Sequence, residues 1–142
     1  MVILDTNVVS ALMRPRENPS VVGWLDTLPR SLIWTTAVTI LEIRFGLAIM
    51  EDGKKRSSLT VSFESLLQGK LLGRVAPFDR SAAEQAADVS SLRRFAGRRV
   101  ETADAQIAGI ALSRGARLAT RNIRDFEGLG LELINPWTGG SW

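Results

Sequence analysis

The stretch Val2-Ile3-Leu4-Asp5-Thr6-Asn7 opens the chain with three apolar residues, a carboxylate and two short polar side chains. The apolar triplet predicts a short buried strand, and residues 6–13 predict a helix that ends before Pro15. Asp5 then follows the carboxyl end of a strand, which is where open α/β sheets bind ligands. Asp is also a favourable helix N-cap, so this stretch alone leaves both roles open.

The rest of the chain repeats this change from strand to helix. Further strands are predicted at residues 32–36, 75–78, 117–120 and 132–134, and further helices at residues 19–28, 37–50, 54–72, 80–98 and 103–113. Strands that alternate with helices favour βαβ crossovers and a parallel sheet. We therefore expect an α/β fold with one domain over residues 1–142. Its sheet should be mostly parallel, with about four to five strands flanked by helices.

Composition excludes several classes of enzyme. The chain has neither His nor Cys, which rules out Ser–His–Asp triads, Cys–His dyads and His-based ribonuclease mechanisms. A catalytic zinc site is disfavoured for the same reason. Carboxylates, Lys, Arg, hydroxyls and oxygen-bound metals remain, and an oxygen-only site favours Mg²⁺ or Mn²⁺.

The termini and the charge suggest where the protein works. The first five residues have no basic segment, which argues against a signal peptide, and no apolar run approaches the roughly 20 residues that span a bilayer. We expect a cytoplasmic protein without membrane contact. The net charge of +3 suits a polyanionic partner. Most of the basic residues are Arg, which binds phosphate through two hydrogen bonds, although a biased genome composition would explain this equally well.

Two acidic residues stand where apolar residues are expected. Glu42 lies on the helical face that carries Val38, Leu41, Phe45 and Ile49. Asp104 lies on the side of its helix that carries Val100, Ile107, Ala108, Ala111 and Leu112. A carboxylate on a buried face is costly unless a cation or hydrogen bonds compensate it. The alternatives are a structural salt bridge for Glu42 and an interaction with the helix dipole for Asp104.

If Asp5, Glu42 and Asp104 meet at one sheet edge, their charges repel. Their pKa values would rise unless a divalent cation lay among them. Such a cation can lower the pKa of bound water and orient it for attack on phosphorus. That chemistry requires neither His nor Cys, which agrees with the composition.

Several motifs in this order resemble a known family. They are Leu4-Asp5-Thr6-Asn7, Thr39-Ile40-Leu41-Glu42-Ile43-Arg44-Phe45-Gly46, Thr102-Ala103-Asp104-Ala105-Gln106-Ile107-Ala108, Ala119-Thr120-Arg121-Asn122 and the closing Asn135-Pro136-Trp137. Together they resemble the four motifs and the tail of the PIN-domain ribonuclease toxins of the VapC and FitB-like family. The resemblance covers nearly the whole chain.

The resemblance implies a single PIN domain with Mg²⁺-dependent endoribonuclease activity, in which Mn²⁺ can substitute. By position, Asp5, Glu42 and Asp104 match the acidic metal-site residues. The fourth acidic position falls on Asn122 or on Asp125. The Thr6 and Thr120 hydroxyls match supporting positions.

The resemblance also implies partners. These are an RNA substrate, a VapB-like or FitA-like antitoxin and a second copy of the chain in a homodimer, with DNA reached only through the antitoxin. The residues expected to support RNA binding are Lys54, Lys55, Arg56 and Arg121, and the pairs Arg93-Arg94 and Arg98-Arg99 are further candidates for backbone contacts.

Three other kinds of protein share some of these features. A haloacid-dehalogenase-like phosphatase needs a second acid two residues after the first, where this chain has Asn7. A receiver domain needs an acidic pair near the first strand and a Lys after the fifth, and neither is present. A non-catalytic nucleic-acid-binding module with the same shape is opposed by the three acids and favoured by Asn122.

Overall fold

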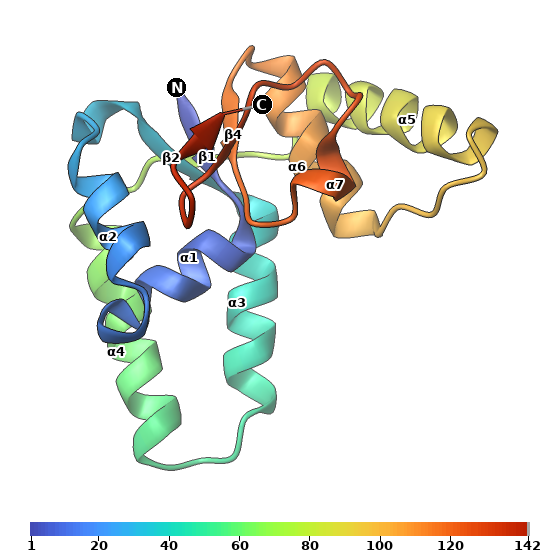
Figure 1. Cartoon of the computed structure of the whole chain (residues 1–142). Coiled ribbons are helices and arrows are strands. Elements are labelled where there is room, and N and C mark those ends of the chain that lie inside the picture. Colours follow the sequence, from blue (N-terminus) through green and yellow to red (C-terminus); the bar gives the residue numbers. More distant parts are fainter. Residues whose placement is uncertain (142) are drawn as a thin grey trace.

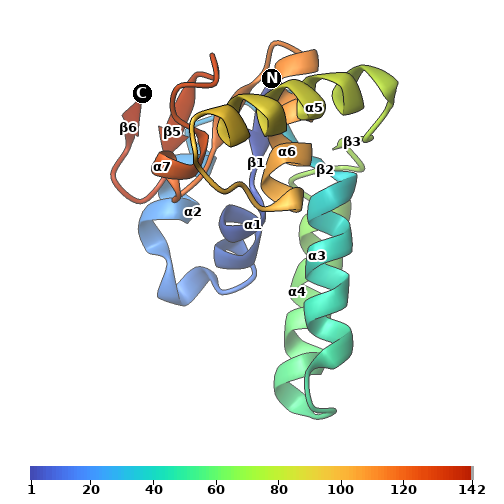
Figure 2. The same ribbon diagram turned by 90° about the vertical axis from the view of Figure 1, so that its right-hand side faces the viewer.

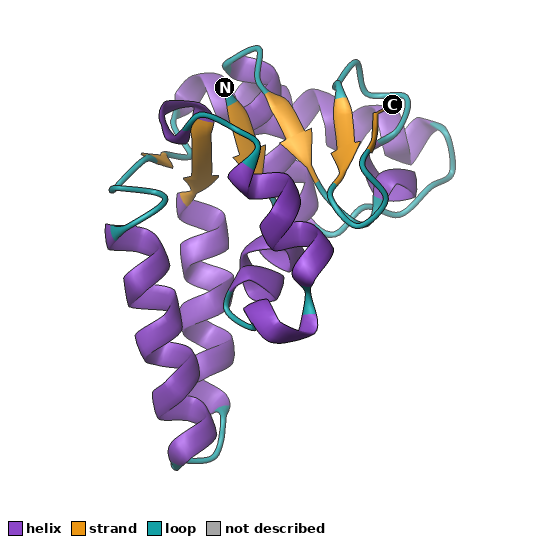
Figure 3. Cartoon of the chain, turned by 60° about the vertical axis from the view of Figure 1, so that its left-hand side comes forward, coloured by secondary structure: helices purple, strands orange, loops and turns teal. Residues whose placement is uncertain are grey.

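A six-stranded sheet forms the centre of the computed structural model, which describes residues 1–141. The strands follow the order β3-β2-β1-β4-β5-β6 (Figure 3). The parallel strands are β1 (Val2–Leu4), β2 (Ile33–Thr36), β3 (Val75–Ala76), β4 (Arg117–Ala119) and β5 (Leu133–Asn135). The sixth, β6 (Gly140–Ser141), runs antiparallel to β5. The expected α/β fold with a mostly parallel sheet is therefore confirmed.

Seven α-helices connect the described strands and cover both faces of the sheet. They are α1 (Thr6–Leu12), α2 (Pro19–Asp26), α3 (Ala37–Ile49), α4 (Lys54–Gln68), α5 (Arg80–Phe95), α6 (Thr102–Ser113) and the short α7 (Ile123–Phe126). Two 3-10 turns, Pro15–Glu17 and Arg30–Leu32, lie on either side of α2. No helix in residues 1–141 is long and apolar enough to cross a membrane.

Alternating side chains along the strands divide the core into two layers. Val2 and Leu4 pack with α1, α2, α3 and α4, whereas Ile3 packs with α5, α6 and α7 on the other face. This alternation follows from the two-residue period of a strand. Figure 1 shows the result: α5, α6 and α7 gather on one side of the strands, and α1, α2 and α4 on the other. Because helices cover both faces, β1 carries buried apolar side chains on both of its sides.

Helices α3 and α4 form a long hairpin that projects away from the sheet (Figure 2). Its connection passes through Gly53, whose φ of 153° lies in the region that favours glycine. Leu47, Leu59 and Phe63 are buried in this hairpin. The inner side of the hairpin therefore belongs to the core layer that also contains Val2 and Leu4, while its outer surface is exposed.

The packing of α5 against α6 depends on a glycine. A Cβ placed on Gly109 would lie 2.4 Å from the carbonyl oxygen of Ala82 and 2.8 Å from the amide nitrogen of Ala86. Those are backbone atoms of α5, so they cannot move aside as a flexible side chain would. Gly109 thus allows α6 to approach α5 closely, which fixes the position of Asp104 one and a half turns earlier in α6.

The strand and helix predictions differ from the structure mainly at the ends. Helix α4 ends at Gln68 rather than at residue 72, and α5 ends at Phe95 rather than at residue 98. The turn expected after β4 contains α7, and β6 was not predicted at all. Both elements are very short, so neither shows enough hydrophobic periodicity to be recognised.

Candidate active site

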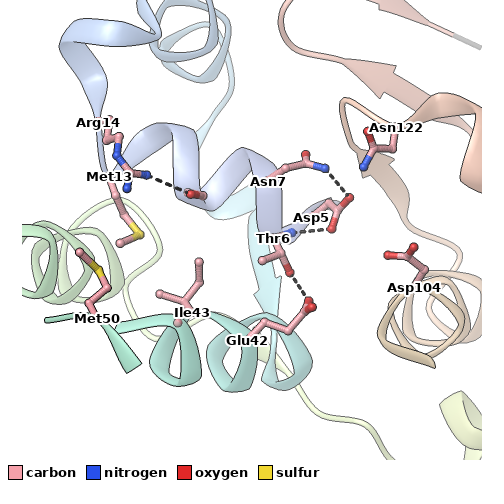
Figure 4. Close-up of a pocket in the computed structure, with 12 residues that line it drawn as sticks. Asp5, Thr6, Asn7, Met13, Arg14, Glu42, Ile43, Met50, Asp104 and Asn122 are labelled. Atoms are coloured by element: carbon pink, nitrogen blue, oxygen red, sulfur yellow. Dashed lines mark hydrogen bonds between the residues drawn. The ribbon is translucent and has the colours of Figure 1, made fainter. Parts of the chain in front are cut away.

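Acidic residues from three distant segments line one cavity of about 510 Å³ at the carboxyl ends of the central strands. Asp5 follows β1, Glu42 comes from α3 and Asp104 from α6, and Asn122 after β4 completes this side of the cavity. Figure 4 shows the three carboxylates around a common space, with Asn122 above Asp104. The structure thus brings together the residues that the sequence singled out.

Asp5 serves as a helix cap and as part of the cavity wall at the same time. It is only 3% exposed. One carboxylate oxygen accepts a hydrogen bond from the Thr6 amide, and the other accepts from the Thr120 hydroxyl at 2.7 Å and from the Asn7 amide group at 3.3 Å. Burial raises the pKa of Asp5; the bonds from Thr120 and Thr6 oppose that rise, and the charge of Glu42 adds to it. The helix-cap role is therefore confirmed, and the position of Asp5 in the cavity wall leaves ligand binding as a prediction.

Glu42 is held by hydroxyl groups. The Thr6 hydroxyl donates to its Oε1 at 2.6 Å, and the same hydroxyl lies 3.1 Å from that of Thr39. The structural salt bridge considered for Glu42 is not found in the described chain, and the neighbouring Arg44 pairs instead with Glu64. The Glu42 carboxylate is therefore held by neutral hydroxyl groups at the border of the cavity.

The prediction that Glu42 lies on a buried apolar face was wrong. Leu41, Phe45 and Ile49 are 67%, 64% and 69% exposed, and the buried face of α3 carries Val38, Thr39, Ile43 and Leu47. Helix α3 is apolar on two faces, and periodicity cannot distinguish the face that packs on the domain from the one that does not. Glu42 lies between the two, half-buried at the border of the cavity.

Asp104 carries the clearest electrostatic sign of crowded carboxylates. It is half-buried in the first turn of α6. The pKa of Asp104 is raised from 3.8 to about 6. Burial is the largest cause of this rise, and the charges of Asp5, Asp125 and Glu42 add to it. The helix dipole favours a negative charge at this position, but it does not outweigh these effects. A cation close to Asp104 would therefore stabilise its charged form.

The fourth position is shared between two residues. Asn122 lines the main cavity, and its backbone N–H donates to the Thr120 hydroxyl at 3.0 Å. Asp125 lies in α7 and faces Asp104 across a smaller adjoining cavity of about 270 Å³. Its charge contributes to the raised pKa of both Asp5 and Asp104. Both candidates for the fourth position therefore lie close enough to act on the acids of the site.

The basic residues that were expected to bind RNA do not all meet at this cavity. Arg121 lies beside it: its amide donates to Asn7 Oδ1, and its guanidinium lies 4.8 Å from the Trp137 ring centroid. Lys54, Lys55 and Arg56 begin α4 at the far tip of the hairpin. Within the single chain they are remote from the acids.

Several residues of the cavity were not predicted. Ser10, Met13, Arg14, Ile43, Gly46 and Met50 extend it away from the acids, along α1 and α3 (Figure 4). Thr39 also supports Glu42, and it could have been found because it lies one helical turn before that residue. Arg14 and the two methionines showed no unusual pattern in the sequence.

The donor set fits a hard divalent cation, although its side chains are not gathered around one point. No group of three or more His, Cys, Asp or Glu side chains in residues 1–141 is close enough to hold a metal ion. Every acid at the cavity supplies oxygen, the type of ligand that Mg²⁺ and Mn²⁺ prefer. Burial first, and then the charges of Asp5, Asp125 and Glu42, raise the pKa of Asp104. A cation among them would relieve that repulsion.

Comparison with known proteins agrees with this geometry. The PIN domain family matches residues 2–130. The chain is 38% identical to the VapC ribonuclease Y4jK of Sinorhizobium fredii, which it matches over 96% of its own length and 98% of the relative's. It is 35% identical to the toxin FitB of Neisseria gonorrhoeae, over 96% and 99% of the two chains. The crystal structure of a FitA–FitB complex from that organism superposes with a TM-score of 0.85, at 35% identity and over 96% and 99% of the chains. With its sheet, its acidic cavity and these relatives, the chain belongs to the PIN-domain family, in the branch of the VapC and FitB-like toxins.

Proposed function

We propose that this protein is a Mg²⁺-dependent endoribonuclease that acts as the toxin of a type II toxin–antitoxin pair, and that Mn²⁺ can replace Mg²⁺. The observation that carries the proposal is the convergence of Asp5, Glu42 and Asp104 on one cavity. The family relationship to named ribonucleases supports it. The chain has no His or Cys, and a metal site built from carboxylates requires neither.

Asp5, Glu42 and Asp104 would hold the cation, which supplies an activated water and neutralises charge on the phosphate. The rest of the site orients these ligands. The Thr120 hydroxyl fixes one oxygen of Asp5, and the Thr6 hydroxyl fixes one oxygen of Glu42. The Asn122 side chain borders the same cavity and can position water through its amide.

RNA binding is expected to use the exposed cations near the cavity. Arg121 is exposed beside Asn7 and can bind a phosphate next to the one that is cleaved. The basic cluster of Lys54, Lys55 and Arg56 is too distant to serve the same cavity in one chain. It can contribute only if the RNA extends along the hairpin or if a second copy brings its own cluster near.

The first test measures cleavage of single-stranded RNA by the purified protein, with Mg²⁺ and with EDTA. Asp5→Asn and Asp104→Asn should each lower the rate by more than about 100-fold while the protein stays folded, as circular dichroism would show. Asp88→Asn is the matched control, because Asp88 is an exposed residue of α5 outside the site. Retained Mg²⁺-dependent cleavage in both site variants would reject the assignment.

The same assay separates the enzyme from a non-catalytic nucleic-acid-binding module. If the wild-type protein binds RNA but leaves it intact with Mg²⁺ and with Mn²⁺, the module is the better description. That alternative draws on Asn122, which stands where an acid is expected. Cleavage that EDTA abolishes would exclude it.

We also propose an antitoxin partner of the VapB or FitA type and a homodimer. Solved structures of relatives are complexes named FitAB and VapBC, some of them bound to DNA. DNA would then be reached only through the antitoxin. The upstream reading frame offers a direct test: its product should copurify with this chain and suppress cleavage. A product that does neither would contradict the pairing.

The homodimer has a candidate surface on α3. Leu41, Phe45 and Ile49 lie on one exposed stripe of that helix, and apolar side chains gathered in this way mark interaction surfaces. Phe45→Glu should convert a dimer to a monomer in light scattering, whereas Val61→Glu on the outer face of α4 should not. Dimers that persist in Phe45→Glu would exclude this surface.

A further inference from the structure

Arg93 occupies a position that is unusual for an arginine at the end of a helix. It lies in the last turn of α5, where a basic side chain would ordinarily point into solvent, yet it is only 5% exposed. It was expected to contact the RNA backbone together with Arg94. Burial makes that role impossible for Arg93, so its guanidinium must serve another purpose.

The guanidinium of Arg93 binds the backbone of the segment that carries Asp125. One of its nitrogens, Nη2, donates to the Asp125 carbonyl oxygen at 3.1 Å and to the Glu127 carbonyl oxygen at 2.7 Å. Arg98, in the loop after α5, donates to the Arg124 carbonyl oxygen at 2.9 Å. Two arginines thus bind three carbonyl groups at the end of α7.

These contacts matter because α7 is too short to hold itself in place. It has four residues, so its last carbonyl groups have no partners within the helix. A single helical turn is also unstable in isolation. Phe126, which is 1% exposed, fixes one side of the turn in the core. The two arginines supply the partners that the carbonyl groups lack.

The turn that they hold places a carboxylate beside the acid cluster. Asp125 and Asp104 line the same small cavity with Arg98, Arg99, Val100 and Glu101. Asp125 is exposed, and its charge acts on Asp104 and Asp5. Without Arg93, repulsion from these two acids would favour movement of the Asp125 carboxylate away from the site. Arg93 binds the backbone carbonyl groups of this segment and not the Asp125 carboxylate. It can therefore resist that movement without forming an ion pair with Asp125.

We propose that Arg93 is a positioning residue which, by gripping the α7 backbone, holds Asp125 as the fourth acidic group of the site. This inference rests on the proposed metal-dependent function, and it assigns the fourth position to Asp125 with Asn122 as its neighbour. Groups that orient a metal site in this indirect way typically change metal affinity 10-fold to 100-fold when they are removed.

The test compares Arg93→Met, which keeps the apolar part of the side chain, with Arg80→Met. Arg80 lies on the same helix, and its side chain is 91% exposed. The Mn²⁺ concentration at half-maximal thermal stabilisation should rise roughly 10-fold in Arg93→Met and in Asp125→Asn. It should stay unchanged in Arg80→Met.

A double variant separates positioning from a general loss of stability. If Arg93 acts through Asp125, then Asp125→Asn should have almost no further effect on Mn²⁺ affinity in the Arg93→Met background. Equal effects of Asp125→Asn in both backgrounds would overturn the proposal. So would an unchanged Mn²⁺ affinity in Arg93→Met.

Hydrogen exchange gives a readout that does not depend on metal binding or catalysis. Amides of residues 123–127 should exchange about 10-fold faster in Arg93→Met than in the wild type, because the carbonyl partners of α7 are lost. Unchanged exchange would overturn the inference. If the wild-type protein cleaves no RNA, the proposed function fails, while the exchange and the Mn²⁺ titration still decide the role of Arg93.

Discussion

Replacing Asp104 with Asn should stabilise the metal-free protein at pH 8. The pKa of Asp104 is raised from 3.8 to about 6 in the folded chain. Between these two pH values the folded state binds more protons than the unfolded state, so stability falls as the pH rises through this window. Above about pH 7 the loss is complete. Asn has nearly the same shape as the protonated acid. Because Asn stays neutral at every pH, the variant does not lose this stability as the pH rises.

The size of the effect follows from the shift. A shift from 3.8 to about 6 corresponds to about 3 kcal/mol at about 1.4 kcal/mol per pH unit. Because Asp104 is only half-buried, solvent screening lowers this to about 1.5 kcal/mol. For a domain of this size, that energy raises the melting temperature by roughly 5 °C. The gain should vanish near pH 4, where the wild-type carboxyl is also protonated.

Thermal melts with EDTA between pH 4 and pH 8 measure this directly. Adding Mn²⁺ should reverse the order, because a ligand at 100 times its dissociation constant stabilises by about 2.7 kcal/mol and the variant loses most of that binding. The reasoning would be refuted if the Asn variant melted no higher than the wild type at pH 8, or if its advantage were equally large at pH 4.

Three further predictions concern hydroxyls and glycines. Thr120→Val removes the hydrogen bond that lowers the pKa of Asp5. The loss of cleavage activity at acidic pH should therefore begin at a higher pH in this variant. An unchanged pH profile would argue against the contribution of that bond. Gly109→Ala should destabilise the fold by about 2–3 kcal/mol in urea unfolding, because its Cβ meets the backbone of α5, and a neutral result would contradict the close packing. Gly46→Ala, with nothing within 4 Å, should instead add up to about 1 kcal/mol of stability, and a loss would show that the site is crowded.

Most of the fold could be predicted because its strands and long helices show strong patterns. Five parallel strands and six of the helices stand close to the positions expected from apolar runs and periodicity. The parts that could not be predicted are those that tertiary contacts create. Helix α7 forms where Arg93 and Arg98 bind its carbonyl groups, and both residues are distant in sequence. No local pattern could indicate it.

The site illustrates a different limit. Asp5 was singled out by its position after a strand, and Asp104 by its place on the apolar side of a helix; the structure places both at the cavity. Glu42 was also singled out, but for a wrong reason, since the apolar face beside it is exposed. Its position was unusual because α3 presents an apolar stripe to the outside as well as to the core. An apolar face on a helix indicates side chains that are buried in the functional protein. A partner, and not only the chain itself, can provide that burial.

Neutral hydrogen-bonding groups orient the carboxylates of the cavity and do not neutralise their charge. Thr120 orients Asp5, and Thr6 orients Glu42, each through a neutral hydroxyl. In residues 1–141, no Lys or Arg side chain forms an ion pair with either acid or with Asp104. An arginine in place of these hydroxyls would stabilise the apo fold, but it would also occupy the position and satisfy the charge that a cation requires. The chain places its nearest buried arginine, Arg93, behind a backbone segment instead. Burial and repulsion together raise the pKa of Asp104, and a bound cation would offset both. Replacing Asp104 by a neutral side chain should therefore stabilise the metal-free protein and impair metal binding together.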